Sequence, residues 1–352
     1  MERWAQLNGT EAREFIDFSA SINPLGPPAS ARRVFVKSYG AISRYPDPYG
    51  ARLKQALAER HNMEPAQVLL GNGSTQLIYL LCSALRPRTA LVVAPAFTEY
   101  ANALKLAGAT VRTLTLCAES GFHFSTGSLI AAWEKDCDIV FLATPNSVTG
   151  QLIGKAEVEE IARAALARKI FVVIDEAFID FVEAESIKPL VRQNPYLIVL
   201  RSLTKYYALP GLRLGYLLGE ARRVAQLAAY QEPWSVNGPA LNVALACLKD
   251  TSFTAKTDRW LEQERKFLFE RLTALEGFRP FPSRANFLLV KIEDKGVNAL
   301  KLRSFLLGKK VLIRACDSFG LGLNYFRVAV RRRKENGRLL AALREWRPSS
   351  IG

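Results

Sequence analysis

The chain has 352 residues, of which 49% are hydrophobic and 23% charged, a composition typical of a globular protein with one large and one smaller domain. No apolar run reaches about 18 residues, and residues 1–18 mix charged with apolar side chains, which argues against a membrane span and a secretory signal. Five scattered cysteines without CxxC spacing, and only two histidines, favour a cytoplasmic protein with free thiols and no metal site.

The net charge of +15 indicates an anionic partner of some kind. Nucleic acid is one candidate, but the basic residues are dispersed along the chain. The densest basic run, at 331–334, begins a predicted helix, where a solvated helix face is the simpler interpretation. We therefore expect an anionic small molecule as the partner, and no nucleic acid.

The first part of the chain predicts an arm followed by an α/β alternation. Residues 23–28 read Asn-Pro-Leu-Gly-Pro-Pro, so we expect the first forty residues to form an irregular arm. Helical patterns and short apolar, β-forming runs then follow one another: helices at 74–85 and 156–168, and strands at 91–94, 139–144, 170–174 and 197–200. This alternation is typical of a mostly parallel sheet covered by helices on both faces.

The C-terminal part of the chain has a different pattern. A helical region runs from Pro239 to about residue 275, and strand-like runs follow at 286–292, 311–315 and 325–330. We expect a smaller α+β domain there. The predicted division is an N-terminal arm over 1–40, a large domain over 41–240 and a small C-terminal domain over 241–352.

The most informative segment is 202–216, where a lysine stands among hydroxyl groups and glycines. Lys205 follows a buried strand, and a lysine at such an edge is desolvated, which lowers its pKa and frees the amine to form an imine. Ser202, Thr204 and Arg213 supply two hydroxyls and a guanidinium for one phosphate. Pyridoxal 5′-phosphate (PLP) requires such an amine beside a phosphate site. The segment also matches the S-x-x-K motif of serine β-lactamases, but neither S-D-N nor K-T-G accompanies it.

Two further strand ends carry residues suited to the same cofactor. Asp175 follows the strand at 170–174, and a carboxylate there points into the crevice where α/β proteins bind ligands. Paired with a pyridine nitrogen, it would keep that nitrogen protonated; a helix cap or a salt bridge is the alternative. Gly73, Ser74 and Thr75 open a helix whose free N–H groups can bind an anion, although a tight turn with a serine cap is equally common.

Other positions are candidates for the ring or the substrate. Asn146 closes the strand at 139–144, and Phe97 follows the strand at 91–94, where it can stack on a ring or pack in the core. Arg314 and Arg327 each fall on a predicted C-terminal strand. Each can bind a substrate carboxylate or phosphate, or form a structural salt bridge.

Together these positions resemble the fold-type I PLP enzymes, the aspartate aminotransferase superfamily. Asn146, Asp175, Lys205 and Arg213 stand in that superfamily's order and spacing, and the resemblance covers nearly the whole chain. It implies an α/β fold with a large PLP-binding domain and a smaller α+β C-terminal domain. By resemblance, Lys205 forms the imine with PLP, Asp175 meets the pyridine nitrogen, Asn146 bonds the 3′-oxygen and Phe97 stacks on the ring.

The resemblance also implies a phosphate site and a partner subunit. The groups expected to hold the cofactor phosphate are those of Gly73, Ser74, Thr75, Ser202, Thr204 and Arg213. Tyr45, within the segment Arg-Tyr-Pro-Asp, is similar to the tyrosine that reaches the cofactor phosphate of the neighbouring subunit. A homodimer is therefore expected.

Two groups within the superfamily are similar to this chain: histidinol-phosphate aminotransferases and threonine-phosphate decarboxylases. The segments 17–26, 175–181 and 233–237 resemble the decarboxylases, and Phe178 stands where the aminotransferases usually have a tyrosine that hydrogen-bonds the ring oxygen. Two features depart from the family pattern. The family's loop sequence T-P-N-N-P-T-G is Thr-Pro-Asn-Ser-Val-Thr-Gly here, at 144–150. The decarboxylases also typically begin with a His-Gly-Gly segment near the substrate phosphate, and this sequence has no histidine before His61.

The resemblance implies PLP-dependent decarboxylation of L-threonine O-3-phosphate to (R)-1-amino-2-propanol O-2-phosphate and CO2, which supplies the aminopropanol linker of cobalamin. Arg327, with Asn23 and Asn146, is expected to orient the substrate carboxylate, and Arg314 the substrate phosphate. An aminotransferase of the histidinol-phosphate type and a decarboxylase of serine phosphate remain as alternatives.

Overall fold

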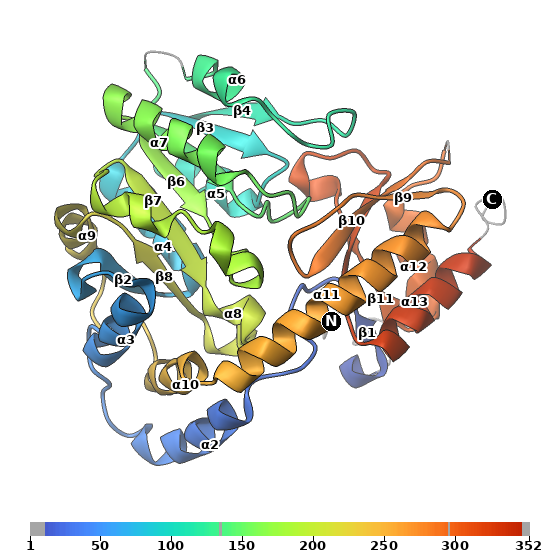
Figure 1. The fold of residues 1–352 in the computed structure, drawn as a ribbon, viewed down its shortest axis with the longest axis horizontal. Helices are drawn as coiled ribbons and strands as arrows, with labels where there is room; N and C mark the ends of the chain where they lie inside the picture. Colours follow the sequence, from blue (N-terminus) through green and yellow to red (C-terminus); the bar gives the residue numbers. More distant parts are fainter. Residues whose placement is uncertain (1–10, 134–135, 295, 347–352) are drawn as a thin grey trace.

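The computed structural model describes residues 11–133, 136–294 and 296–346, and within them seven strands form the large sheet, in the order β2-β8-β7-β6-β5-β3-β4 (Figure 1). Their bounds are β2 Val68–Asn72, β3 Thr89–Ala94, β4 Thr110–Thr115, β5 Ile139–Ala143, β6 Phe171–Asp175, β7 Leu197–Ser202 and β8 Leu214–Leu218. The neighbours from β4 to β7 pair in parallel, and β8 pairs antiparallel with β2 and β7. The predicted mostly parallel sheet is confirmed.

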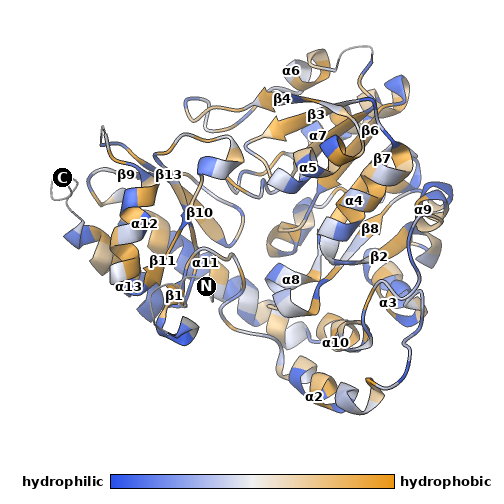
Figure 2. Cartoon of the chain, turned by 180° about the vertical axis from the view of Figure 1, so that it is seen from behind, coloured by the Kyte–Doolittle hydropathy of each residue, from blue (hydrophilic) through white to orange (hydrophobic). Residues whose placement is uncertain are grey.

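Helices cover both faces of this sheet. Their bounds are α3 Ala51–His61, α4 Gly73–Leu85, α5 Thr98–Leu106, α6 Thr126–Ala131, α7 Lys155–Arg168, α8 Leu203–Tyr206 and α9 Ala221–Ala228. On β6, Val173 packs in the core shared with α4 and α5, whereas Val172 and Ile174 pack in the core shared with α3 and α7. Alternate residues of a strand therefore face opposite helical layers, and the inner strands of the sheet are mostly hydrophobic (Figure 2).

A second, antiparallel sheet of the described residues has the order β12-β13-β10-β9. Its strands and the helices around it are β9 Phe278–Pro280, β10 Phe287–Ile292, β12 Arg314–Ala315, β13 Tyr325–Ala329, α11 Thr251–Thr273, α12 Ala299–Gly308 and α13 Arg333–Glu345. Figure 1 shows α11 running from the large-sheet side to this second sheet. The expected C-terminal α+β region is confirmed, while the boundaries near residues 40 and 240 stay predictions.

The N-terminal arm is more regular than the sequence predicted. Its strand β1 (Ile16–Asp17) pairs in parallel with β11 (Val311–Leu312), and α2 (Ala29–Ser38) packs on α10 (Gly238–Leu248). The prediction of an irregular arm is therefore wrong over 29–38, because Pro28 takes the N-cap position and no helix breaker follows it before residue 38. Residues 1–10 and 347–352 of the predicted arm and C-terminal domain lie outside the described residues. Every described helix is too short or too polar to cross a membrane.

Candidate active site

The carboxyl ends of β6 and β7 place two predicted site residues on one face of the sheet. Asp175 is the last residue of β6, beside Leu200 of β7, and Ser202 is the last residue of β7. Val173 of β6 and Leu200 of β7 pack in the core shared with α4 and α5, and Asp175 and Ser202 each follow one of them by two residues. Alternate residues of a strand point to the same face, so the side chains of Asp175 and Ser202 lie on that face too. The adjacent residues Glu176 and Arg201 consequently face the opposite layer.

Lys205 lies in the single-turn helix α8, which Ser202 caps through its hydroxyl. Lys205 Nζ donates to Thr204 Oγ1 at 3.0 Å, and that oxygen lies 2.8 Å from Ser202 Oγ. Burial lowers the pKa of Lys205 to about 8, the charge of Asp175 opposes this shift, and the charges of Arg213 and Arg327 add to it. These groups therefore converge on one amine, which is neutral often enough near neutral pH to act as a nucleophile.

Asp175 is held by two hydrogen bonds. Its Oδ2 accepts from the Tyr100 hydroxyl at 2.5 Å, and its Oδ1 accepts from the Ala177 N–H at 2.9 Å. Burial raises the pKa of Asp175, and the two hydrogen bonds and the charge of Lys205 oppose that rise. Tyr100 was not predicted, although it stands one helical turn after Phe97, whose ring it meets edge-on at 5.8 Å. Phe97 itself is the N-cap residue of α5 and is half-buried.

The start of α4 forms a cradle for an anion. The side chain of the N-cap residue, Asn72, accepts no hydrogen bond from the helix. The first backbone N–H groups of α4, near Ser74 and Thr75, are therefore not capped by this side chain. A Cβ on Gly73 (φ +78°) would lie 2.8 Å from Arg213 Nη2, and one on Gly215 would lie 2.4 Å from the Ser74 nitrogen. Glycine at both positions thus lets Arg213 and β8 approach the helix end, as a phosphate site requires.

Asn146 is fixed by the loop that departs from the family pattern. Its Oδ1 accepts from the N–H groups of Val148 (2.9 Å) and Thr149 (3.0 Å), and its Nδ2 donates to the Pro95 carbonyl oxygen at 2.9 Å. One of the two amide hydrogens remains for a ligand. A proline at position 148 has no N–H, so this chain orients Asn146 with a bond that the usual pattern cannot make.

Arg314 and Arg327 are opposite each other on β12 and β13. Arg327 Nη1 donates to the Ser147 carbonyl oxygen, its Nε is buried without a hydrogen-bond partner, and Arg314 Nη2 donates to Ser318 Oγ at 2.7 Å. Within the described residues neither guanidinium forms an ion pair with a carboxylate. Burial lowers the pKa of Arg327 to about 10, and the charge of Arg314 adds to the effect. Arg314 and Arg327 are therefore neighbouring cations whose charges favour the binding of an anion.

The model of the aminotransferase class I and II family matches residues 13–343. The chain belongs to this family. The threonine-phosphate decarboxylase of Salmonella typhimurium is 39% identical over 97% of this chain and 93% of its own length. Histidinol-phosphate aminotransferase 2 of Archaeoglobus fulgidus is 32% identical over 95% of this chain and 93% of its own. The crystal structure of the histidinol-phosphate aminotransferase from Clostridium acetobutylicum superposes with a TM-score of 0.87 at 30% identity, covering 94% of this chain and 98% of that one.

The cofactor of the aminotransferase class I and II family is PLP, and the residues of this site fit it. The buried Lys205 amine suits imine formation, and the buried Asp175 carboxylate suits a pyridinium nitrogen. The cradle at Gly73, with Arg213 across it, suits the phosphate. When PLP is bound, it supplies an electron sink next to the substrate Cα.

Asn23 lies beside this aminotransferase-family lysine, but its side chain is bonded within the protein. Its backbone N–H donates to the Lys205 carbonyl oxygen at 3.1 Å, and its Nδ2 donates to the Tyr206 carbonyl oxygen (2.9 Å) and to Thr257 Oγ1 (3.0 Å). Its Oδ1 accepts from the Leu25 N–H. Both amide hydrogens are committed, so the geometry supports holding the lysine turn rather than the predicted substrate contact.

Tyr45 stays apart from the residues that the fold brings together. Its side chain is 85% exposed, and its ring packs on Trp234 with 5.1 Å between the centroids.

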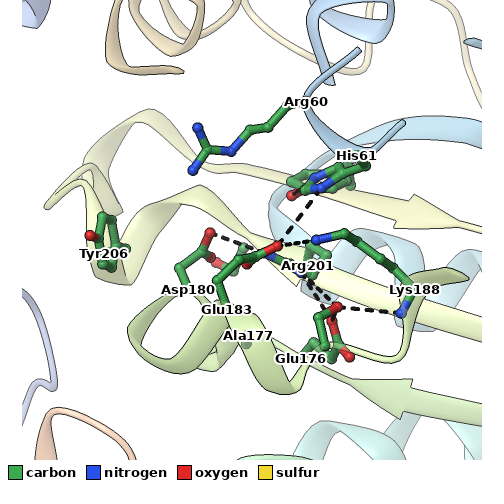
Figure 3. A network of polar contacts seen from close by, with 12 residues as sticks. Arg60, His61, Glu176, Ala177, Asp180, Glu183, Lys188, Arg201 and Tyr206 are labelled. Carbon is green, nitrogen blue, oxygen red and sulfur yellow. Dashed lines mark hydrogen bonds and ion pairs between the residues drawn. The ribbon is translucent and has the colours of Figure 1, made fainter. Parts of the chain in front are cut away.

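A second polar cluster lies on the opposite face of the same strand ends (Figure 3). Arg201 is fully buried and donates to Glu176 Oε2 at 3.0 Å, to Asp180 Oδ1 at 3.1 Å and to Glu183 Oε2. Burial raises the pKa values of Glu176 and Asp180; it acts in the same direction on Glu183, but Arg201 and Lys188 hold the pKa of Glu183 at about 2. This cluster was not predicted from the sequence, although Arg201 and Glu176 directly adjoin Ser202 and Asp175.

Proposed function

We propose that this chain decarboxylates L-threonine O-3-phosphate, with PLP bound at Lys205. The observation that carries the proposal is the pair of guanidiniums of Arg314 and Arg327, which form no ion pair among the described residues. An amino acid phosphate brings two anionic groups, and a guanidinium binds either of them through paired N–H donors. A substrate with a single anion would leave one of the two guanidiniums without an anionic partner.

Two observations favour decarboxylation over amino transfer. The Salmonella decarboxylase is 39% identical to this chain, compared with 32% for the Archaeoglobus aminotransferase. Phe178, three residues after Asp175, has no hydroxyl with which to bond the cofactor's ring oxygen. Its ring is buried and packs on the edge of Phe287, with 5.1 Å between the centroids.

In this proposal each residue has a defined task. Asp175 would hold a proton on the ring nitrogen of PLP, and Asn146 would offer its remaining N–H to the ring oxygen. Arg327 would orient the substrate carboxylate for loss as CO2, and bound PLP would accept the electron pair of the broken bond. Lys205 Nζ, in its protonated form, would supply a proton to Cα.

The test compares two reactions of the purified protein with added PLP. O-phosphothreonine alone is expected to yield CO2 and aminopropanol phosphate without a keto acid. Consumption of 2-oxoglutarate with histidinol phosphate or O-phosphothreonine, and no release of CO2, would contradict the proposal. O-phosphoserine, which lacks one methyl group, should react with a kcat/KM lower by roughly 10- to 200-fold.

We also propose that the chain acts in the cytoplasm as a homodimer in which Tyr45 reaches the neighbouring cofactor phosphate. An open hollow of about 810 Å³ lined in part by Tyr45 and Trp234, and exposed apolar side chains at Tyr39 and Ile42, support an interface there. The five cysteines form no disulfide, which supports the proposed cytoplasmic location, because disulfides are rare there.

The proposed homodimer can be tested by sedimentation, which should give twice the monomer mass of 39.2 kDa. The variant Tyr45→Phe should weaken PLP binding without dissociating the dimer. A monomer with full activity would refute this.

A further inference from the structure

Aromatic rings hold both substrate arginines. The guanidinium carbon of Arg327 lies 4.7 Å from the centroid of Phe287 and 5.8 Å from that of Phe319. The guanidinium carbon of Arg314 lies 4.7 Å from the same Phe319 ring. All three distances fall within the range of about 6 Å over which a ring face attracts a cation. Phe319 thus contacts the guanidiniums of both Arg314 and Arg327, whereas Phe287 contacts that of Arg327.

In a site that binds anions, an aromatic ring can hold a guanidinium without neutralising its charge, which a carboxylate cannot do. A carboxylate beside Arg327 would neutralise its charge and occupy the N–H groups needed for the ligand. A ring face attracts the cation through its quadrupole and leaves the edge of the guanidinium, with its donors, free. The structure agrees with this division, since the two guanidiniums donate to a carbonyl oxygen and a hydroxyl and, among the described residues, to no carboxylate.

Phe287 also links Arg327 to the cofactor side of the site. It begins β10 and is fully buried, with Phe178 packed on it edge-on. Opposite it on β13 stands Ala329, whose small side chain leaves room for the neighbouring guanidinium on the same face. Phe178 in turn follows Asp175 by three residues. One ring therefore stands between the segment that meets the cofactor ring and the arginine that orients the substrate carboxylate.

We propose that Phe287 and Phe319 are positioning residues that fix Arg327 and Arg314, and that Phe287 thereby decides which bond of the substrate stands perpendicular to the cofactor. This inference rests on the proposed function. Leucine at either position fills much of the same volume but offers no ring face. The guanidinium would then move, and the substrate carboxylate would move with it.

The experiment compares Phe287→Leu with a matched control, Phe326→Leu. Phe326 is also fully buried, lies on β13 directly beside Arg327, and packs on Phe278 instead of the arginine. Both variants should unfold at a lower temperature than the wild type. Only Phe287→Leu is expected to raise KM for O-phosphothreonine, by roughly 2- to 30-fold, the range of one lost cation–π contact. It should also divert part of the turnover from CO2 release to amino transfer.

Two further measurements keep the test decisive if Phe287→Leu folds poorly. Phe319 is half-buried on a short surface turn, so Phe319→Leu should fold, raise KM and leave the product ratio nearly unchanged. Phe319→Tyr keeps the ring face and should restore KM. In the Lys205→Ala background, where the reaction cannot run, the same substitutions should raise the dissociation constant for O-phosphothreonine by the same factors.

The two ideas fail differently. If the wild type releases CO2 but Phe287→Leu and Phe319→Leu match Phe326→Leu in KM, dissociation constant and product ratio, the positioning role is wrong and the proposed function stands. If the wild type transfers amino groups and releases no CO2, the proposed function is wrong. The positioning role of the rings is then decided by the amino-transfer KM of the same variants.

Discussion

Two arginine clusters in this molecule solve the problem of a buried cation in opposite ways. Arg201, on the opposite face of the large sheet, forms ion pairs with three carboxylates (Figure 3). Arg327, on the second sheet, has ring faces and a carbonyl oxygen as partners and, among the described residues, no ion pair. A cation whose charge is already balanced holds a structure together, whereas a cation left unbalanced can receive a substrate. This difference separates the scaffold of the site from its binding groups.

Both clusters adjoin the same chemistry from different sides. Arg201 and Glu176 alternate along their strands with Ser202 and Asp175, so their ion pair ties together the two strand ends that carry the lysine turn and the pyridinium partner. Removal of Arg201 should therefore act mainly on stability, and removal of Arg327 mainly on catalysis.

The largest expected effect is that of Arg201→Met. Three carboxylates, two of them with buried side chains, would lose their cation, and the free energy of unfolding should fall by about 3–5 kcal/mol. Urea denaturation measures this directly. Because this variant risks failing to fold, Glu183→Gln, at the more exposed edge of the cluster, provides a milder version with a smaller loss in the same direction. Unchanged stability in both variants would break the comparison.

Arg327→Met should reverse that pattern. Loss of the guanidinium that orients the carboxylate should lower kcat/KM roughly 10²- to 10³-fold, a cost of about 3–4 kcal/mol. The free energy of unfolding should fall much less than in Arg201→Met, because no carboxylate is left without its cation. Steady-state kinetics and urea denaturation on one preparation provide both numbers. A loss of stability as large as that of Arg201→Met would show that the two clusters do not differ.

The pH dependence of stability provides a third, intermediate test. The pKa of Lys205 is about 8 in the folded protein, against 10.5 ordinarily, so burying its protonated form costs stability below about pH 8. That cost disappears as the pH rises from about 8 to 10.5. In protein freed of PLP, Lys205→Met should therefore raise the melting temperature at pH 7, and the gain should shrink by pH 10. A gain that is equal at both values would mean that the lysine is not desolvated.

The smallest expected effect is that of Phe178→Tyr. A hydroxyl at this position could bond the cofactor's ring oxygen, and one such bond should change the share of amino transfer by about 2- to 10-fold. Comparison of CO2 release with keto-acid-dependent turnover measures the share. If the product ratio does not change, this position does not help to choose the reaction.

The parts of this site that depend on strand ends could be predicted from the sequence, and those that depend on layers could not. Asp175 ends one apolar strand and Lys205 follows the next, and strand ends of a parallel sheet meet at one edge. The bond from Tyr100 to Asp175 depends on how α5 lies over the sheet, which no local pattern encodes. Asn23 shows the same limit, because its partner Thr257 is 234 residues away and consumes the amide expected for the substrate.

The fold shows a similar division. Hydrophobic runs located β3, β5, β6 and β7 of the large sheet, since their alternate residues are buried against helices on both sides. The helix Ala29–Ser38 was missed because its hydrophobic partner is α10, far along the chain, and the prolines and glycine at 24–28 dominated the local pattern.

One measurement tests the central claim most directly: the fate of the carboxyl carbon when O-phosphothreonine labelled at that carbon is incubated with the PLP-loaded protein and no keto acid. The account predicts one labelled CO2 for each aminopropanol phosphate formed, and much slower formation of both in Arg327→Met while the protein remains folded. The account would be contradicted if the label stayed in the organic product and if that product accumulated only when a keto acid was added.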